Sequence, residues 1–189
     1  MRRTVIDNNK CFNCHEWFEG HGGNRVLNME ICLLCHVPNL SSSGREITEP
    51  SDDVIEALGP DTLSYPEATQ NMKEMIHGIH ASAVRTTDYE HVRNRNNGIY
   101  YNWSEVTFPA DAGNCLVCHL EDTYQLPLDE NVLMTVNRTT GVADGMDATP
   151  ADVTTARENV PNDTDWVVTP ATGSCYSCHD SAESVAHMT

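Results

Sequence analysis

Four copies of one five-residue pattern decide how this chain folds: Cys11-Phe12-Asn13-Cys14-His15, Cys32-Leu33-Leu34-Cys35-His36, Cys115-Leu116-Val117-Cys118-His119 and Cys175-Tyr176-Ser177-Cys178-His179. All 8 cysteines of the chain lie in these copies. Cys-x-x-Cys-His is the attachment pattern of a c-type haem. Each of the two thiols forms a thioether with one vinyl group of the haem, and the next residue presents an imidazole to the iron. The sequence therefore predicts four covalently bound haem c groups, with the motif cysteines as tethers and each motif histidine as one axial ligand.

A Cys-x-x-Cys pair also occurs in dithiol redox sites, in zinc sites and as a structural disulfide. With 9 histidines in 189 residues, any position is His about one time in twenty, so four chance hits directly after the second cysteine are roughly a one-in-a-hundred-thousand event. A four-thiolate zinc ribbon needs no His in that position, and a thioredoxin-like site needs one pair rather than four. The haem interpretation is therefore favoured over the other three.

The composition indicates a chain with little core of its own. It is 39% hydrophobic but only 6% aromatic, so the large side chains that fill a core are scarce. Haem is a large flat apolar group, and a polypeptide around four haems buries apolar surface without long helices or sheets. We expect a multihaem cytochrome c, mostly irregular with a few short α-helices wrapped around four haems and minimal β structure.

The charge and the hydropathy restrict the partners and the location. The formal net charge is -17, and four ferric haems with ionised propionates bring it to about -21, which argues against nucleic acid as a partner. No run of eighteen apolar residues exists to span a membrane, and the start Met1-Arg2-Arg3 lacks the apolar region of a secretory signal. Since covalent haem is attached outside the cytoplasm, we expect a mature or excised segment of an exported precursor.

The motifs are unevenly spaced, but nothing divides the chain, so we expect a single tetrahaem domain over residues 1–189. The best predicted helix covers residues 65–83, which have a proline near the start and apolar residues at helical spacing. Residues 85–104 are polar and Asn-rich, with Asn96-Asn97-Gly98 as a turn signal. Residues 120–174 are rich in Thr, Asp and Pro, with one candidate extended run at 132–136, and are expected to form a polar insertion or a flap over a haem.

Five histidines outside the motifs are available as second axial ligands for four irons. His77 and His80 are three residues apart on the predicted helix and emerge on one face, so they are expected to ligate two different haems. His21 precedes two glycines that let the backbone approach a flat ring, and His187 follows the last motif on a short predicted helix. His91 is the expected spare, in an Arg- and Asn-rich loop. With enough histidines available, the methionines are expected to fill space rather than to ligate.

These segments resemble the haem domain of the OmcA/MtrC family of multihaem cell-surface cytochromes. The resemblance rests on four stretches besides the motifs: His21-Gly22-Gly23-Asn24-Arg25, Met75-Ile76-His77-Gly78-Ile79-His80-Ala81, Val106-Thr107-Phe108-Pro109, and the closing Cys175 to Met188. It implies ligation by His21, His77, His80 and His187, a location at the cell surface on the outer membrane face, and electron transfer to ferric minerals, flavins or other multihaem cytochromes. The family's haem domains usually carry five haems and follow a β domain, whereas this chain has four motifs and no such domain before them.

We therefore expect a cytochrome that relays single electrons along closely spaced bis-His haems in extracellular electron transfer. Irons with two imidazole ligands have no vacant position for a substrate, so no substrate-transforming catalysis is expected. Two alternatives stay open: a subunit of a polymeric filament, in which one copy's histidine completes a haem of the next, and a multihaem reductase with one open haem. A periplasmic location is the alternative to the cell surface.

Overall fold

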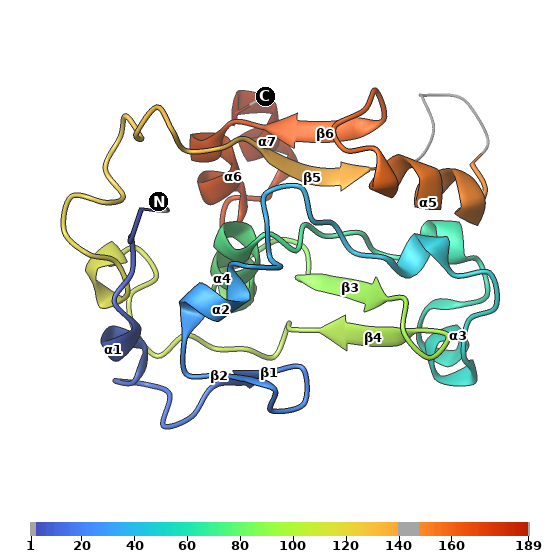
Figure 1. Cartoon of the computed structure of the whole chain (residues 1–189), viewed down its shortest axis with the longest axis horizontal. Helices are drawn as coiled ribbons and strands as arrows, with labels where there is room; N and C mark the ends of the chain where they lie inside the picture. The colour runs from blue at the N-terminus through green and yellow to red at the C-terminus, as the bar shows by residue number, and fades with distance from the viewer. Residues whose placement is uncertain (1–2, 140–147, 189) are drawn as a thin grey trace.

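Short helices joined by long irregular segments make up most of the chain. The computed structural model describes residues 3–139 and 148–188 (Figure 1). The helices are α1 (Asn8–Cys11), α2 (Met29–Cys32), α3 (Asp52–Leu58), α4 (Met72–His80), α5 (Pro150–Glu158), α6 (Pro170–Tyr176) and α7 (Ala182–Met188). Three antiparallel pairs of strands join β1 (Glu19–Gly20) to β2 (Arg25–Val26), β3 (Glu90–Arg93) to β4 (Ile99–Asn102), and β5 (Thr135–Thr139) to β6 (Asp165–Val168). The expected combination of short helices and little sheet is found.

The buried core is small. One apolar cluster joins Ile47, Val54, Tyr65 and Val92 beside α3 and the β3–β4 hairpin. The chain exposes 11440 Å² of surface, whereas a globular protein of 21.0 kDa exposes about 9,000 Å². The polypeptide therefore leaves much more of its surface uncovered than a self-sufficient domain of its size.

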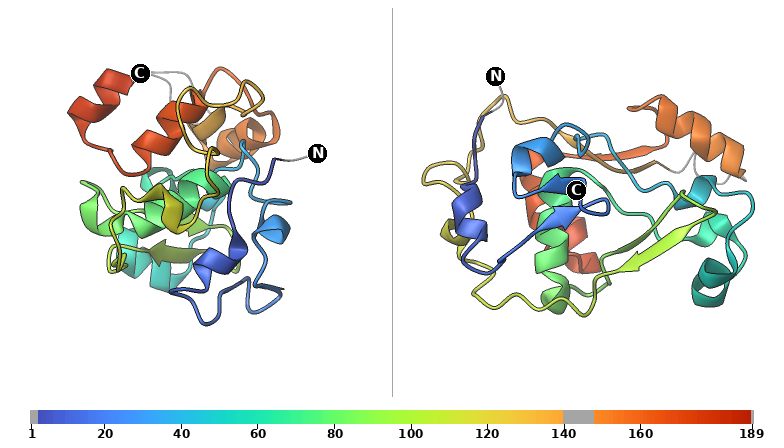
Figure 2. Two further views of the ribbon diagram at one scale, coloured as in Figure 1. Left: turned by 90° about the vertical axis from the view of Figure 1, so that its left-hand side faces the viewer. Right: turned by 60° about the horizontal axis from the view of Figure 1, so that its bottom comes forward.

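Helix α4 lies at the centre of the molecule, beside α6 (Figures 1 and 2). Its first turn is capped by Asn71, whose side chain accepts a hydrogen bond from the Glu74 N–H at 3.1 Å. The predicted helix over 65–83 is therefore correct in its middle but begins seven positions too early. Residues 66–71 are extended instead, because they pair with residues 40–42, as in the bridge between Ser41 and Thr69.

The polar stretch 85–104 forms a hairpin rather than a loop. Asn96, Asn97 and Gly98 all have positive φ, so the predicted turn is present, and β3 and β4 flank it. The expected loop position of His91 is wrong: it lies in β3 with 8% of its surface exposed, and its ring stacks on Tyr101 at 5.2 Å.

The described part of 120–174 contains β5, β6, α5 and most of α6. Helix α5 begins with a capping box between Thr149 and Asp152 and with Pro150 in its first turn. Arg157 on this helix pairs with Glu46 at 2.7 Å and donates to the Ser41 carbonyl, so α5 is fixed to the first third of the chain. None of the described helices has the length and hydropathy needed to cross a membrane.

Candidate haem sites

The four Cys-x-x-Cys-His motifs adopt one backbone conformation. In each, the carbonyl of the first cysteine accepts hydrogen bonds from the N–H of the second cysteine, at 3.1–3.3 Å, and from the N–H of the histidine, at 2.8–3.0 Å. Helices α1 and α2 both end at a first cysteine and are capped by Asp7 and Asn28, so local sequence produces the same turn at distant places. This turn fixes the positions of the two thiols and the imidazole relative to one another. A haem that is tethered by both thiols and ligated by the imidazole requires such an arrangement.

Four of the motif thiols differ from the reactive thiol of a dithiol redox site. Burial raises the pKa of Cys11 and Cys32, the first cysteines of their motifs, and also that of Cys118 and Cys178. Reactive Cys-x-x-Cys pairs instead lower the pKa of a thiol to favour the thiolate. Within the described residues, no three His, Cys, Asp or Glu side chains converge in a metal cluster of the zinc type.

Three of the four motif histidines face a histidine from outside the motifs. The ring centroids of His15 and His80, of His36 and His21, and of His119 and His77 are each 6.0 Å apart. Imidazoles bonded to opposite sides of one metal ion, with metal–nitrogen bonds of roughly 2 Å, have ring centres about 6 Å apart. The three pairs thus leave a gap that fits one iron each.

His77 and His80 face different motif histidines although they are on one face of α4. His77 lies opposite His119 with an angle of 23° between the rings, while His80 lies opposite His15 with an angle of 84°. The two histidines of one helical turn thus form ring pairs with two different motifs.

Hydrogen bonds at two rings leave the Nε2 atom available. His36 Nδ1 lies 2.7 Å from the Gln70 carbonyl, and His80 Nδ1 lies 2.8 Å from the Ile76 carbonyl. A carbonyl oxygen only accepts, so Nδ1 donates in both contacts and a neutral ring has its lone pair on Nε2. Metal-ligating histidines commonly donate the other ring N–H to a carbonyl in this way.

The rings of His77 and His119 are half-buried. Burial lowers the pKa of His77 to about 4, with smaller contributions from His119 and Lys73, and burial also lowers the pKa of His119. The Nδ1 atoms of both rings are buried without a hydrogen-bond partner in the described part of the chain. Two imidazoles 6.0 Å apart, each with an unpartnered ring nitrogen, are suited to hold a metal ion.

His21 has a different setting. Gly22 and Gly23, with φ of 69° and 80°, form the tight turn between β1 and β2 that carries it. An N–H of Arg93 points to His21 Nδ1 at 3.3 Å, so in this contact Nδ1 accepts and the proton of a neutral ring is on Nε2. Ligation through Nε2 requires the proton to move to Nδ1 and the Arg93 contact to open.

The fourth motif has no facing histidine in ring contact. His179 and His187 are both exposed, and within the described residues neither ring contacts another. His187 is in the last turn of α7, the short helix expected there. The motif itself is firmly anchored, because Asp180 accepts from the N–H groups of Thr86 and Thr87 and pairs with Arg85 at 3.3 Å.

Helix α4 connects all four motifs. Its first N–H, from Met72, donates to the His36 carbonyl at 3.2 Å, and His77 and His80 face the third and first motifs. On the side of the fourth motif, Lys73 Nζ donates to the Pro170 carbonyl of α6 at 3.0 Å. One helix thus helps to fix the relative positions of the four motifs.

The first and third motifs are also joined directly. Ile6 and His119 form an antiparallel bridge, and the Asp7 N–H donates to the Cys118 carbonyl at 3.1 Å. Lys10 Nζ, one residue before Cys11, donates to the carbonyls of Leu116 at 3.0 Å and His119 at 2.6 Å. Segments more than a hundred positions apart are thereby held side by side.

The motif surroundings also fit a flat apolar group. Phe12, Leu34 and Leu116 lie between the two cysteines of their motifs and are 38%, 74% and 42% exposed. Apolar side chains exposed at the attachment points are what a tethered macrocycle would cover.

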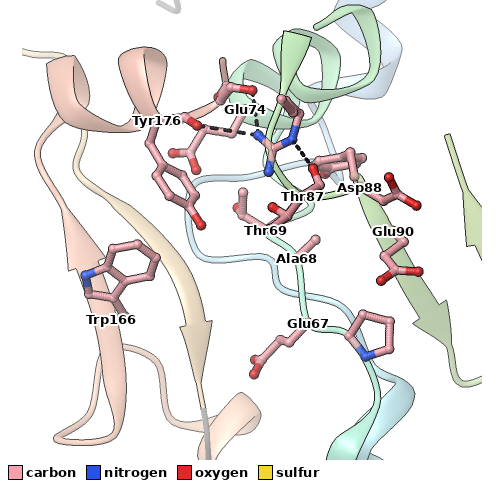
Figure 3. A pocket seen from close by; sticks show the side chains of 13 residues that line it. Glu67, Ala68, Thr69, Glu74, Thr87, Asp88, Glu90, Trp166 and Tyr176 are labelled. Carbon is pink, nitrogen blue, oxygen red and sulfur yellow. Dashed lines mark hydrogen bonds between the residues drawn. The ribbon is translucent and has the colours of Figure 1, made fainter. Parts of the chain in front are cut away.

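A separate pocket of about 230 Å³ lies between α4, β3 and the β5–β6 pair (Figure 3). Arg85 crosses it, donating to the carbonyls of Tyr176 and Ser177, and Glu67, Asp88 and Glu90 line the acidic side. Its volume is below the roughly 300–1,000 Å³ of typical ligand sites. Tyr176 and Ser177 of the fourth motif are among its lining residues.

The sequence pattern of a family described as "Outer membrane cytochrome MtrC/MtrF-like, domains II/IV" matches residues 3–189. The chain belongs to this family. It is accordingly an outer membrane cytochrome domain that binds haem c and transfers electrons, and the predicted resemblance is confirmed. No curated protein and no solved structure matches the chain.

Proposed function

We propose that this domain holds four haem c groups and relays single electrons between them. The tethers are the cysteine pairs Cys11/Cys14, Cys32/Cys35, Cys115/Cys118 and Cys175/Cys178. The axial ligand pairs are His15 with His80, His36 with His21, His119 with His77, and His179 with His187. The observation that carries the proposal is the 6.0 Å ring distance repeated in three histidine pairs of different sequence separation.

The haem iron, when bound, supplies reversible one-electron redox chemistry. The protein fixes the positions of the histidine ligands and of the sites relative to one another. Helix α4 sets His77 and His80 one turn apart, and the bridge between Ile6 and His119 holds their two sites together. Carbonyl oxygens orient His36 and His80. Two imidazoles per iron leave no position for a substrate, so electron transfer rather than catalysis is the proposed role.

The proposed location is the cell surface on the outer membrane face, with other multihaem cytochromes, ferric minerals or flavins as partners. Family membership supports the membrane assignment. The acidic surface, with 28 acidic against 11 basic side chains, supports a partner other than nucleic acid.

The fourth site is where the two alternatives differ from the main proposal. His179 and His187 are exposed and not in ring contact, so His187 must approach as the haem is bound. An iron without that ligand would be the open haem of a reductase. A histidine from a second copy at the same place would make the chain a filament subunit.

The test uses the mature holoprotein. Intact mass should correspond to four tethered haems, and the electron paramagnetic resonance spectrum should be wholly low-spin. His80→Ala and His77→Ala should each convert one haem to high spin, and the double variant should convert two. The control is His91→Phe, which keeps a ring on Tyr101 and should leave every haem low-spin.

Two results would contradict the proposal. One high-spin haem in the double variant would mean that His77 and His80 do not serve separate irons. A high-spin haem in the unaltered protein that binds carbon monoxide would favour the reductase, and low-spin character that disappears on dilution would favour the filament.

A further inference from the structure

The angle between the facing imidazoles differs among the three histidine pairs. In the pairs of the second and third motifs, the ring planes differ by 28° and 23° and are close to parallel. In the pair of the first motif, the rings of His15 and His80 cross at 84°. All three pairs have 6.0 Å between their ring centroids, so the relative rotation of the rings sets the first pair apart.

A phenylalanine packs edge-on against each ring of the crossed pair. Phe18 meets His15 with 6.3 Å between ring centroids and an angle of 77°, and Phe108 meets His80 at 5.5 Å and 82°. His80 Nδ1 also donates to the Ile76 carbonyl at 2.8 Å. None of these contacts has to open for an iron to bind, because the paired rings already stand 6.0 Å apart and the His80 hydrogen bond leaves Nε2 free.

Phe18 is itself fixed in position. Its ring stacks on Phe12 at 5.5 Å with 21° between the planes, and its carbonyl accepts from the Leu27 N–H at 3.1 Å, at the base of the β1–β2 hairpin. Within residues 3–139 and 148–188, no hydrogen bond holds the His15 ring, and its ring contacts there are with Phe18 and His80. The orientation of His15 therefore depends on Phe18.

Phe108 belongs to Val106-Thr107-Phe108-Pro109, one of the stretches that carried the family resemblance. The Val106 N–H donates to the Trp103 carbonyl at 2.9 Å and closes a turn after β4. Proline restricts the residue before it to an extended backbone, which limits the freedom of Phe108. The stretch thereby presents an aromatic ring to His80.

We infer that Phe18 and Phe108 are positioning residues that keep the two imidazoles of the first haem site crossed, so that this haem differs electronically from the second and third. Axial ligands tune the electronic structure of a haem iron, and neighbouring groups orient those ligands. Parallel imidazoles raise the energy of the same iron d orbital, whereas crossed imidazoles raise one orbital each and leave the two nearly equal. The inference rests on the proposed function, since it requires an iron between His15 and His80.

The crossed arrangement also bears on the reduction potential. Low-spin ferric iron has its vacancy in the upper of these two d orbitals. Two imidazoles raise that orbital when they are parallel, but only one does so when they are crossed. The ferric state is therefore stabilised less by crossed rings, and at equal exposure to solvent the first haem accepts an electron more readily than the other two.

Low-temperature electron paramagnetic resonance of the oxidised holoprotein tests the crossed geometry. Two nearly equal d orbitals give a low-spin signal with very large g anisotropy, whereas two well-separated orbitals give a rhombic signal. The spectrum should contain signals of both kinds. His80→Ala should remove a strongly anisotropic signal, while His77→Ala should remove a rhombic signal and leave the strongly anisotropic one in place.

Phe18→Leu tests the positioning role. Phe18 is half-buried and lies outside the buried apolar cluster, so the fold should tolerate leucine. The His15 ring then adopts a range of angles, and the strongly anisotropic signal should lose most of its intensity while every haem stays low-spin. Phe108→Leu should cause a smaller loss, because the Ile76 carbonyl still orients His80.

The matched control is Tyr124→Leu. Tyr124 packs edge-on against His119 at 5.6 Å and 69°, which is the same kind of contact in a pair whose rings are nearly parallel. This variant should leave the strongly anisotropic signal unchanged. An equal loss of that signal in Tyr124→Leu would reduce the effect to a general loosening of the sites and overturn the positioning role.

The outcomes separate the inference from the proposed function. If every haem is low-spin but His80→Ala removes only a rhombic signal, the inference is wrong and the proposed function stands. The same holds if Phe18→Leu or Phe108→Leu leaves the strongly anisotropic signal at full intensity. If haems are missing or high-spin in the unaltered protein, the proposed function fails and the inference fails with it.

Discussion

Gly78→Ala tests how closely α4 packs on the ring of Tyr89. Gly78 lies between His77 and His80 and packs on the ring of Tyr89. A Cβ at this position would lie 2.5 Å from Tyr89 Cδ2 and 2.8 Å from Cε2. Real Cβ atoms do not approach so closely, so either the ring or the helix must shift.

The ring has little freedom to shift. Tyr89 is 5% exposed, and its hydroxyl donates to the Thr69 carbonyl at 2.5 Å. Overpacking of this kind costs about 1–3 kcal/mol, while alanine gains about 1 kcal/mol over glycine inside a helix. Because the ring is hydrogen-bonded and buried, the cost of overpacking should exceed the gain in helix propensity, with a net loss of up to about 2 kcal/mol.

The assay is thermal unfolding of the holoprotein, followed by circular dichroism. A loss of 1 kcal/mol lowers the midpoint by about 2–4 °C for a chain of this size. Gly20→Ala is the control, since its Cβ would meet nothing within 4 Å. A Gly78→Ala protein as stable as the unaltered one would refute the close packing of α4 on Tyr89.

Three further predictions concern the anchors of the sites. Asp180→Asn removes the carboxylate that pairs with the buried Arg85 charge, so the free energy of unfolding should fall by about 3 kcal/mol. A guanidinium chloride titration measures this loss, and an unchanged unfolding midpoint would contradict it. Thr149→Ala removes the cap of α5 and should cost about 1 kcal/mol, seen as faster hydrogen exchange in that helix; Thr155→Ala, an exposed change in the same helix, should not accelerate it. His77→Met should raise the potential of one haem, by a fraction of the roughly 0.8 V that axial ligands span, without stopping haem attachment. Redox titration curves identical to those of the unaltered protein would show that His77 is no ligand.

Local signals predicted local structure well. The apolar spacing of Met72, Met75, Ile76 and Ile79 indicated α4, and Asn96-Asn97-Gly98 indicated the hairpin turn. The helix α5 was missed although Thr149-Pro150-Ala151-Asp152 is a capping box with a proline in the first turn. The composition of residues 120–174, rich in Thr, Asp and Pro, favours loops and so does not indicate this helix.

Long-range contacts could not be predicted from the sequence. The predicted helix begins at residue 65, which is too early, because residues 66–71 pair with residues 40–42. No local sequence pattern reveals this pairing. The burial of His91 depends on its stacking against Tyr101 across a hairpin whose strands were not expected. Helical spacing predicts that His77 and His80 emerge on one face of α4, but which motif histidine each ring meets depends on long-range contacts such as the bridge between Ile6 and His119.

The distribution of the facing histidines along the chain implies an order of maturation. The chain is synthesised from its N-terminus, so both members of the pair of His21 and His36 are present first. The pair of His15 and His80 follows, and the pair of His77 and His119 is last. The first motif must therefore wait for α4 before its second imidazole is available.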